Sequence, residues 1–284
     1  MKAGRKLAQF MGFMLLRVCL YAVLAVLILF LYDIISKGGG MISWEFLSKP
    51  PRLGMTEGGI FPAIMGTFLV TMITAVLAIP LGMFAAIYLN EYAKQTRSTR
   101  LIRLSIRNLS GVPSIVYGLF GVILFVNMLR FGTSILSAGL TLGLMTLPWT
   151  ITASEEALKT IPNSYREGAL ALGATKWQSI RTNVLPYAIP GMLTGTVLGL
   201  ARAAGETAPI LFTGAAFFLP VLPRSLSDQF MALPYHLYIM STQHHAIQQV
   251  RPIAYGTALV LIALVLGLNM TAIILRYRMR RKQQ

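Results

Sequence analysis

The sequence predicts an all-α membrane protein with about six transmembrane helices. Of its 284 residues, 55% are hydrophobic and 12% are charged, whereas soluble domains are about 25% charged. Apolar runs of about 20 residues, the length that crosses a bilayer as a helix, recur along the whole chain. We therefore expect one membrane domain over residues 1–284, with the first span and an outer loop in 1–59 and the core helices in 60–275.

Each apolar run is predicted to be helical, because backbone polar groups in hydrocarbon must find their hydrogen bonds within the segment. The first run is longer than the core of a signal peptide, which is about 7 to 15 residues, so we expect a retained span. Pro80 and Pro209 fall within predicted spans and indicate kinks or breaks. The six expected spans are 10–35, 60–89, 111–129, 135–152, 189–218 and 253–275.

The positive charges predict the orientation. The connections 1–9, 90–110, 153–188 and 276–284 hold 17 Lys and Arg residues, and the opposite connections hold 6. Since cytoplasmic loops carry the excess of basic residues, both termini are predicted to be cytoplasmic. The net charge of +16 then follows from membrane topology, and we expect no nucleic-acid partner.

Five basic residues between spans two and three recur at intervals of three or four: Lys94, Arg97, Arg100, Arg103 and Arg107. This spacing favours a helix on the inner membrane surface that touches anionic lipid headgroups. A regulatory ligand site is the alternative.

A row of glycines marks the fifth predicted span. Gly191, Gly195 and Gly199 repeat every fourth residue and so lie on one helical face, where small residues allow a second helix to approach closely. The neighbour is either another helix of this chain, which is the simpler reading, or a helix of a partner.

The loop 153–188 is too long for a simple connector, and it predicts two short helices. Ser164 and Glu167 have capping-box spacing, as do Thr175 and Gln178. Gly173 would end the first helix in a left-handed conformation. Tyr165, Ala169 and Leu172 fall on one face of that helix and form an apolar stripe suited to a groove of another protein.

Glu167, Ala169, Gly173 and the later Leu185-Pro186 also match the spacing E-A-A-x3-G-x9-I-x-L-P. In this the chain resembles the permeases of binding-protein-dependent ABC importers, although it has Gly168 where that family often has Ala. The resemblance implies the type I ABC importer permease fold, with residues 153–188 as the coupling-helix loop that docks on an ATP-binding subunit. It assigns that docking to Ser164, Tyr165, Glu167, Ala169, Leu172 and Gly173.

The sequence contains no G-x-x-x-x-G-K-[ST] phosphate loop. ATP hydrolysis is therefore expected on a separate chain. We expect this chain to catalyse no reaction and to need no cofactor.

Arg202 and Glu206 lie four residues apart within the fifth predicted span. Charges at membrane depth are costly, so they face a pore or each other. Two readings stay open: a self-neutralising pair that staples the helix, or an anion contact by Arg202 with Glu206 orienting it. A guanidinium suits the second role because its planar fork fits phosphate oxygens.

The string R-A-x-G-E-T-A-P around Arg202 is similar to the phosphate-specific permeases of the PstA family, and so is Asn108-Leu-Ser-Gly-Val-Pro-Ser-Ile-Val-Tyr-Gly118. Sulfate and molybdate permeases commonly have G-E-F-G at this point. The resemblance implies a second permease subunit (PstC-like), an ATP-binding subunit dimer (PstB-like) and an extracytoplasmic phosphate-binding protein (PstS-like). It also implies a multi-pass protein of a bacterial or archaeal plasma membrane. It adds Thr207, Ser114 and Tyr117 to the pathway, although hydrogen bonds between packed helices are an equal reading of the last two hydroxyls.

Three alternatives remain: a permease for sulfate, molybdate or phosphonate; a transporter or channel that acts alone; and a membrane-embedded enzyme. We expect no metal site, because Cys19 is the one cysteine and His236, His244 and His245 lie in an outward loop with few acidic neighbours.

Overall fold

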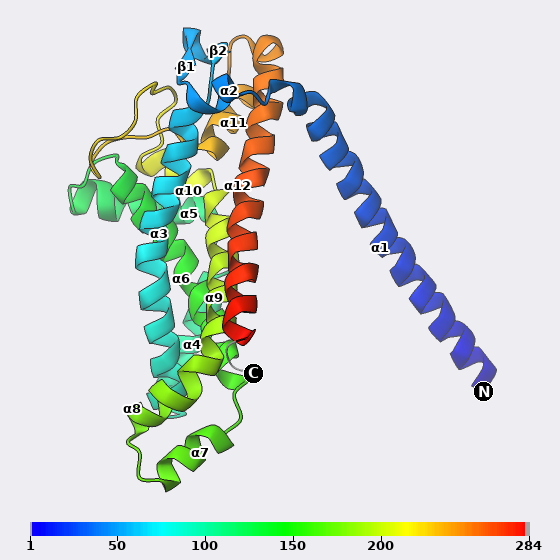
Figure 1. Cartoon of the computed structure of the whole chain (residues 1–284), viewed down its shortest axis with the longest axis vertical. Helices are drawn as coiled ribbons and strands as arrows, with labels where there is room; N and C mark the ends of the chain where they lie inside the picture. The colour runs from blue at the N-terminus through cyan, green and yellow to red at the C-terminus, as the bar shows by residue number, and fades with distance from the viewer. Residues whose placement is uncertain (1, 282–284) are drawn as a thin grey trace.

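A computed structural model describes residues 2–281 and shows a helical bundle from which one helix diverges (Figure 1). The transmembrane part consists of α1 (Lys2–Gly38), α3 (Phe61–Ile87), α5 (Ser114–Gly121), α6 (Ile135–Lys159), α9 (Leu185–Ala204), α10 (Ala208–Thr213) and α12 (Ile247–Arg281), and the basic helix α4 (Arg97–Leu109) leads into α5. The shorter elements are α2 (Trp44–Ser48), α7 (Ser164–Ala171), α8 (Lys176–Ser179), α11 (Leu233–Thr242), the strands β1 (Pro51–Arg52) and β2 (Glu57–Gly58), and the 3-10 turns η1 (Gly39–Met41) and η2 (Leu53–Met55). Wide π-helical turns are η3 (Tyr88–Tyr92), η4 (Val122–Met128) and η5 (Ile180–Val184).

The predicted span count is confirmed. Within residues 2–281, five helices are long and apolar enough to cross a membrane, and a bent pair makes a sixth. In that pair α4 meets the segment Ser114–Met128 at 102°. The third predicted span, 111–129, is thus short, and Pro113 stands at the bend, where it starts α5 and cannot continue α4.

The fifth predicted span, for which Pro209 predicted a kink or a break, is broken. α9 already starts at Leu185, ends at Ala204, and is followed by a break at residues 205–207. Pro209 lies in the first turn of α10, so it begins a new helix and does not kink an existing one. Gly205, a poor helix former, caps the end of α9.

α6 lies at the centre of the bundle and packs against α3 and α9 (Figure 1). The glycine row of α9 faces α6 of the same chain. A methyl group added at Gly195 would overlap the Ala153 side chain, and one added at Gly191 would come within 3.0 Å of Ala157 Cβ. The contact is therefore intrachain, and small residues on both helices let the two backbones approach closely.

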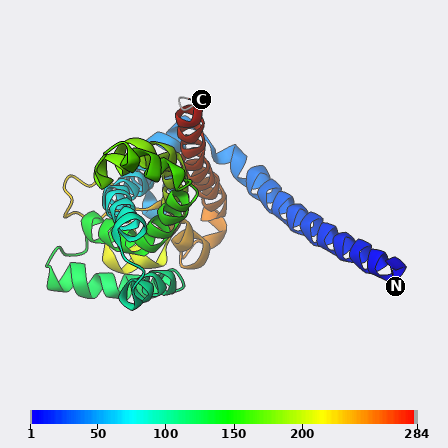
Figure 2. The ribbon, with the colours of Figure 1, turned by 90° about the horizontal axis from the view of Figure 1, so that it is seen from below.

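α1 contacts α12 near the end of the molecule that carries α2, and its N-terminal part lies away from the bundle, as Figures 1 and 2 show. Its apolar side chains between Phe10 and Phe30 are mostly exposed. The beginning of α1 and the end of α12 lie at the end of the molecule that carries α7 and α8 (Figure 1). This agrees with two termini on one side of the membrane.

The opposite end, which the charge pattern predicts to face outward, contains α2, the strand pair and α11 (Figure 1). Two of the three histidines expected in an outward loop are buried: His236 is 2% exposed and His244 is 3% exposed. His244 Nε2 lies 2.7 Å from the Gly54 carbonyl oxygen. Burial lowers the pKa of His236 to about 4. Among residues 2–281, no group of three His, Cys, Asp or Glu side chains is arranged as metal ligands would be.

Candidate functional site

Arg202 and Glu206 flank the break between α9 and α10. Arg202 lies in the last turn of α9, and Glu206 lies just beyond Gly205. Arg202 Nε is 3.4 Å from Glu206 Oε1, and the two side chains are 51% and 18% exposed. The pair therefore forms, but it leaves half of the arginine free for other contacts.

The surroundings of Arg202 are an aromatic ring and an open groove. The guanidinium carbon lies 5.1 Å from the centre of the Trp149 ring of α6, which suits a cation–π contact. On the other side, Arg202 and Glu206 line a groove of 490 Å³ between α9 and α12. The other lining residues are small or aliphatic: Ala201, Gly205, Leu261, Ile262, Val265 and Leu266. A cation and a carboxylate are thus presented in an otherwise apolar groove.

The remaining residues of the predicted pathway are distributed differently. Thr207 is half-buried at the start of α10, next to the ion pair. Ser114 is the first residue of α5. Tyr117 lines a separate apolar groove between α4, α5 and α6, and its hydroxyl donates to the Leu109 carbonyl at 2.9 Å. The structure thus places Thr207 next to Glu206 at the start of α10 and uses the Tyr117 hydroxyl to fix the bend between α4 and α5.

α7 protrudes at the end of the molecule predicted to be cytoplasmic (Figure 1). The predicted capping box at Ser164 is wrong: Asn163 holds the cap position and Ser164 is the first helical residue. The predicted stop at Gly173 is confirmed by its φ of +84°, and the second capping box, Thr175 with Gln178, is formed as predicted.

The predicted apolar stripe of α7 is divided between two surroundings. Ala169 is 8% exposed and packs inward. The Tyr165 ring meets Tyr187 of α9 edge-on, with 5.1 Å between ring centres. Leu172 is 90% exposed just after the helix. α7 therefore uses one part of its apolar surface for the chain itself and presents the other to solvent.

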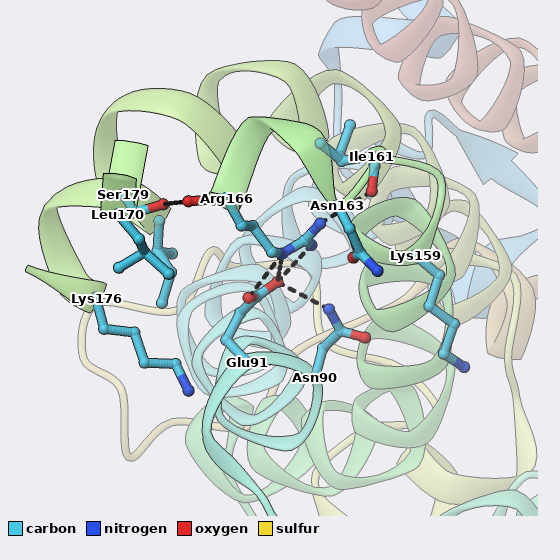
Figure 3. Close-up of a pocket in the computed structure, with 10 residues that line it drawn as sticks. Asn90, Glu91, Lys159, Ile161, Asn163, Arg166, Leu170, Lys176 and Ser179 are labelled. Carbon is cyan, nitrogen blue, oxygen red and sulfur yellow. Dashed lines mark hydrogen bonds and ion pairs between the residues drawn. The ribbon is translucent and has the colours of Figure 1, made fainter. Parts of the chain in front are cut away.

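Sequence reasoning missed a buried ion pair that holds α7 in place. Arg166 of α7 meets Glu91 of η3, with Nη2 to Oε1 at 2.7 Å and Nε to Oε2 at 3.0 Å (Figure 3). Their side chains are 18% and 4% exposed. The two residues are 75 positions apart, so no local pattern reveals the contact.

A second buried ion pair lies at the same end. Arg103 of α4 meets Glu155 of α6, with Nε to Oε1 at 2.7 Å, and its Nη2 also donates to the Leu89 carbonyl at 2.7 Å. Arg103 thus points inward and does not face the lipid as predicted. The other arginines of α4, Arg97, Arg100 and Arg107, are exposed. They are called the surface arginines below.

Relatives of known sequence agree with this architecture. The chain is 31% identical over 280 residues to the probable ABC transporter permease protein YqgI of Bacillus subtilis, covering 95% of each chain. It is 35% identical to the phosphate transport system permease protein PstA 1 of Mycobacterium tuberculosis, covering 80% of this chain and 72% of that one.

Solved structures share the fold at low sequence identity. A chain of the MetNI methionine ABC transporter in an inward-facing conformation superposes with a TM-score of 0.62 at 16% identity, covering 78% of this chain and 97% of that chain. A chain of a bacterial ABC transporter involved in the import of the acidic polysaccharide alginate gives a TM-score of 0.63 at 14% identity, covering 91% and 95%.

The family model described as the binding-protein-dependent transport system inner membrane component matches residues 78–283. This region begins in the middle of α3 and includes α7, the broken α9–α10 segment and α12. The chain therefore belongs to the family of inner membrane permease components of binding-protein-dependent transport systems.

Proposed function

We propose that the chain is a permease subunit of an ABC importer that moves inorganic phosphate into the cytoplasm by alternating access. The observation that carries the proposal is Arg202, half exposed in an apolar groove at a helix break. A permanently charged fork at such a point suits an oxyanion, because guanidinium and phosphate oxygens form strong paired hydrogen bonds. The phosphate permeases among the relatives indicate which oxyanion it is.

In this proposal Arg202 contacts the passing anion, and Glu206 orients the guanidinium and weakens its hold on the anion. Thr207, and Ser114 at the start of α5, are further polar groups that a phosphate would pass. Of the proposed pathway residues, Tyr117 has the least support, because its hydroxyl already donates to the Leu109 carbonyl at the end of α4.

The proposed complex contains a PstC-like second permease, a PstB-like ATPase dimer and a PstS-like extracytoplasmic binding protein. ATP is hydrolysed by the ATPase, and this chain carries out no bond chemistry. α7 serves as the coupling helix: Leu172 and the exposed faces of Tyr165 and Leu170 form an apolar surface that a groove of the ATPase can cover.

The chain is proposed to lie in the plasma membrane of a bacterium or archaeon, with α7 on the cytoplasmic side. α4 lies nearly perpendicular to the segment that follows it, so it would run along the inner membrane surface. Its surface arginines then meet anionic lipid headgroups, which attract basic residues near the membrane.

The test is phosphate uptake by proteoliposomes that contain the whole complex. We expect uptake that requires ATP and the binding protein and that excess sulfate, molybdate or phosphonate does not reduce. Competition by one of these anions would instead identify the cargo as that anion. Uptake by this chain alone, without the ATPase, would identify a stand-alone transporter.

The coupling role of α7 has its own test in the same vesicles. Leu172→Asp places a charge on the exposed docking surface and should reduce both ATPase binding and uptake. Since Leu172 is 90% exposed, the change leaves the fold of this chain intact. Unchanged uptake by Leu172→Asp, and by Glu167→Arg, would exclude the assignment.

A further inference from the structure

Arg166 is the point where four segments of the cytoplasmic end meet. Its guanidinium binds the Glu91 carboxylate of η3 and also donates to the carbonyls of Ile161 and Leu158, at 2.9 and 3.2 Å. Its own backbone carbonyl accepts a hydrogen bond from Ser179 of α8 at 3.3 Å. Figure 3 shows Glu91 and Ile161 at the Arg166 side chain and Ser179 at its backbone carbonyl. α7 is thereby connected to the ends of α3 and α6 and to the start of the α8–α9 segment.

This junction is held by several hydrogen bonds between largely buried groups. Glu91 is 4% exposed, and Asn90 Nδ2 also donates to its Oε1 at 2.8 Å. A buried carboxylate that loses its hydrogen-bonded partner is strongly disfavoured, and Lys176, the next cation that acts on Glu91, does not hydrogen-bond to it in the described residues. The pair therefore stays closed when α7 moves, and the end of α3 moves with it.

The contacts of α3 carry such a movement into the bundle. α3 packs against α6 along its length, where glycines of α6 admit side chains of α3. A methyl group added at Gly139 would lie 2.5 Å from Ile73 Cγ2. Interdigitated helices of this kind shift together because their cores are close-packed.

Space for a displacement exists beside the pair. A cavity of 390 Å³ lies between α7, the end of α3 and the end of α6, and Asn163, Lys159 and Lys176 contribute to its lining. α7 and the attached end of α3 thus have room to move together on that side.

We propose that Arg166 and Glu91 are positioning residues that transmit the displacement of α7 to α3, so that ATP-driven movement reaches the pathway helices through this ion pair as well as through the chain connection from α7 to α9. The proposal rests on the coupling role of α7 given above. It names α3 as a second helix driven by that movement.

The experiment uses the complete complex in proteoliposomes and measures ATP hydrolysed and phosphate imported in the same vesicles. The variants are Glu91→Gln, which keeps the shape and removes the charge, Arg166→Met, which keeps the length, and the two combined. We expect each single variant to raise the ATP used per phosphate about fivefold or more, with all subunits still copurifying. The double variant should use as much ATP per phosphate as the worse single variant. Both substitutions break the same ion pair, so their effects are not independent.

Glu156→Gln is the matched control. It removes an exposed ion pair with Lys159, 2.8 Å long, at the same end of the molecule. We expect its ATP-to-phosphate ratio to stay within about twofold of the unmodified complex, since exposed pairs contribute little.

Three results would overturn the proposal. The first is an unchanged ratio of ATP hydrolysed to phosphate imported in both single variants, and the second is a double variant in which the two increases of this ratio multiply. The third is loss of subunits from the complex in every variant. The last would show a pair that serves assembly alone. Leu172→Asp separates this failure from failure of the coupling role. If Leu172→Asp reduces uptake while the pair variants do not, α7 still docks the ATPase and transmission through α3 is excluded.

Discussion

Replacing Arg202 by Gln separates an anion contact from a structural ion pair. The substitution removes the charge and the planar fork but keeps a polar side chain in the groove between α9 and α12. Two interactions are lost within the chain: the 3.4 Å pair with Glu206 and the cation–π contact with Trp149.

The cost in stability follows from the exposure of these groups. An ion pair whose arginine is 51% exposed contributes at most about 1 kcal/mol, and an exposed cation–π contact adds about 0.5–1 kcal/mol. The total stays below about 2 kcal/mol, so we expect Arg202→Gln to fold and to assemble.

The cost in transport is larger if Arg202 contacts the anion. A hydrogen bond between charged groups contributes about 1.5–3 kcal/mol, which corresponds to about a 10- to 100-fold loss of uptake at low phosphate concentration. The assay is initial-rate uptake of labelled phosphate by proteoliposomes with the whole complex. Arg251→Gln, which removes an exposed arginine in the first turn of α12, is the control and should transport normally.

Uptake by Arg202→Gln within about twofold of the unmodified complex, together with a lower melting temperature, would refute the anion contact. Such an outcome assigns the arginine to the ion pair alone, because a loss below about 2 kcal/mol is what the two exposed contacts predict.

Three further predictions concern packing, acid stability and lipid. Gly195→Ala should destabilise the complex by about 1–3 kcal/mol in thermal unfolding, because the new methyl group meets Ala153; Gly267→Ala, which meets no atom within 4 Å, should not, and equal melting temperatures would contradict the packing. Because His236 has a pKa of about 4 when folded and 6.5 when unfolded, unfolding binds a proton as the pH falls. Stability should therefore decrease between pH 6.5 and 4 by about 3 kcal/mol, at about 1.4 kcal/mol per unit; a His236→Leu variant with the same acid dependence would exclude this source. Replacing the three surface arginines by Gln should reduce the anionic lipid that copurifies with the complex, measured by native mass spectrometry, and unchanged retention would place α4 away from the headgroups.

The span count could be predicted because it depends on local chemistry. Hydrocarbon requires a helix wherever about 20 apolar residues follow one another, and the basic loops orient them. Helix ends were less predictable. Pro209 predicted a kink or a break in the fifth span, and only the structure shows a break that follows Ala204, with this proline in the first turn of α10.

The same distinction holds for the candidate site. Arg202 and Glu206 stand out in the sequence because charge in an apolar run is rare. Tyr117 enters the predicted pathway through the family resemblance alone, yet its hydroxyl donates to the Leu109 carbonyl, which the turn between α4 and α5 brings within reach. Among the basic residues before span three, periodicity did not distinguish Arg103, which Glu155 of α6 draws inward.

The sequence by itself determined that this chain crosses the membrane about six times, and it predicts which side its loops occupy and that ATP is hydrolysed by a separate chain. These conclusions follow from composition, from the order of charges and from short motifs, each of which acts within a few turns of helix. Only the tertiary structure decided that Glu91 and Arg166 meet, that the glycines of α9 face α6, and that Arg202 lies at a helix break with half its surface free. Such contacts join segments far apart in the chain, and their formation depends on how all the helices pack together, which no local pattern encodes.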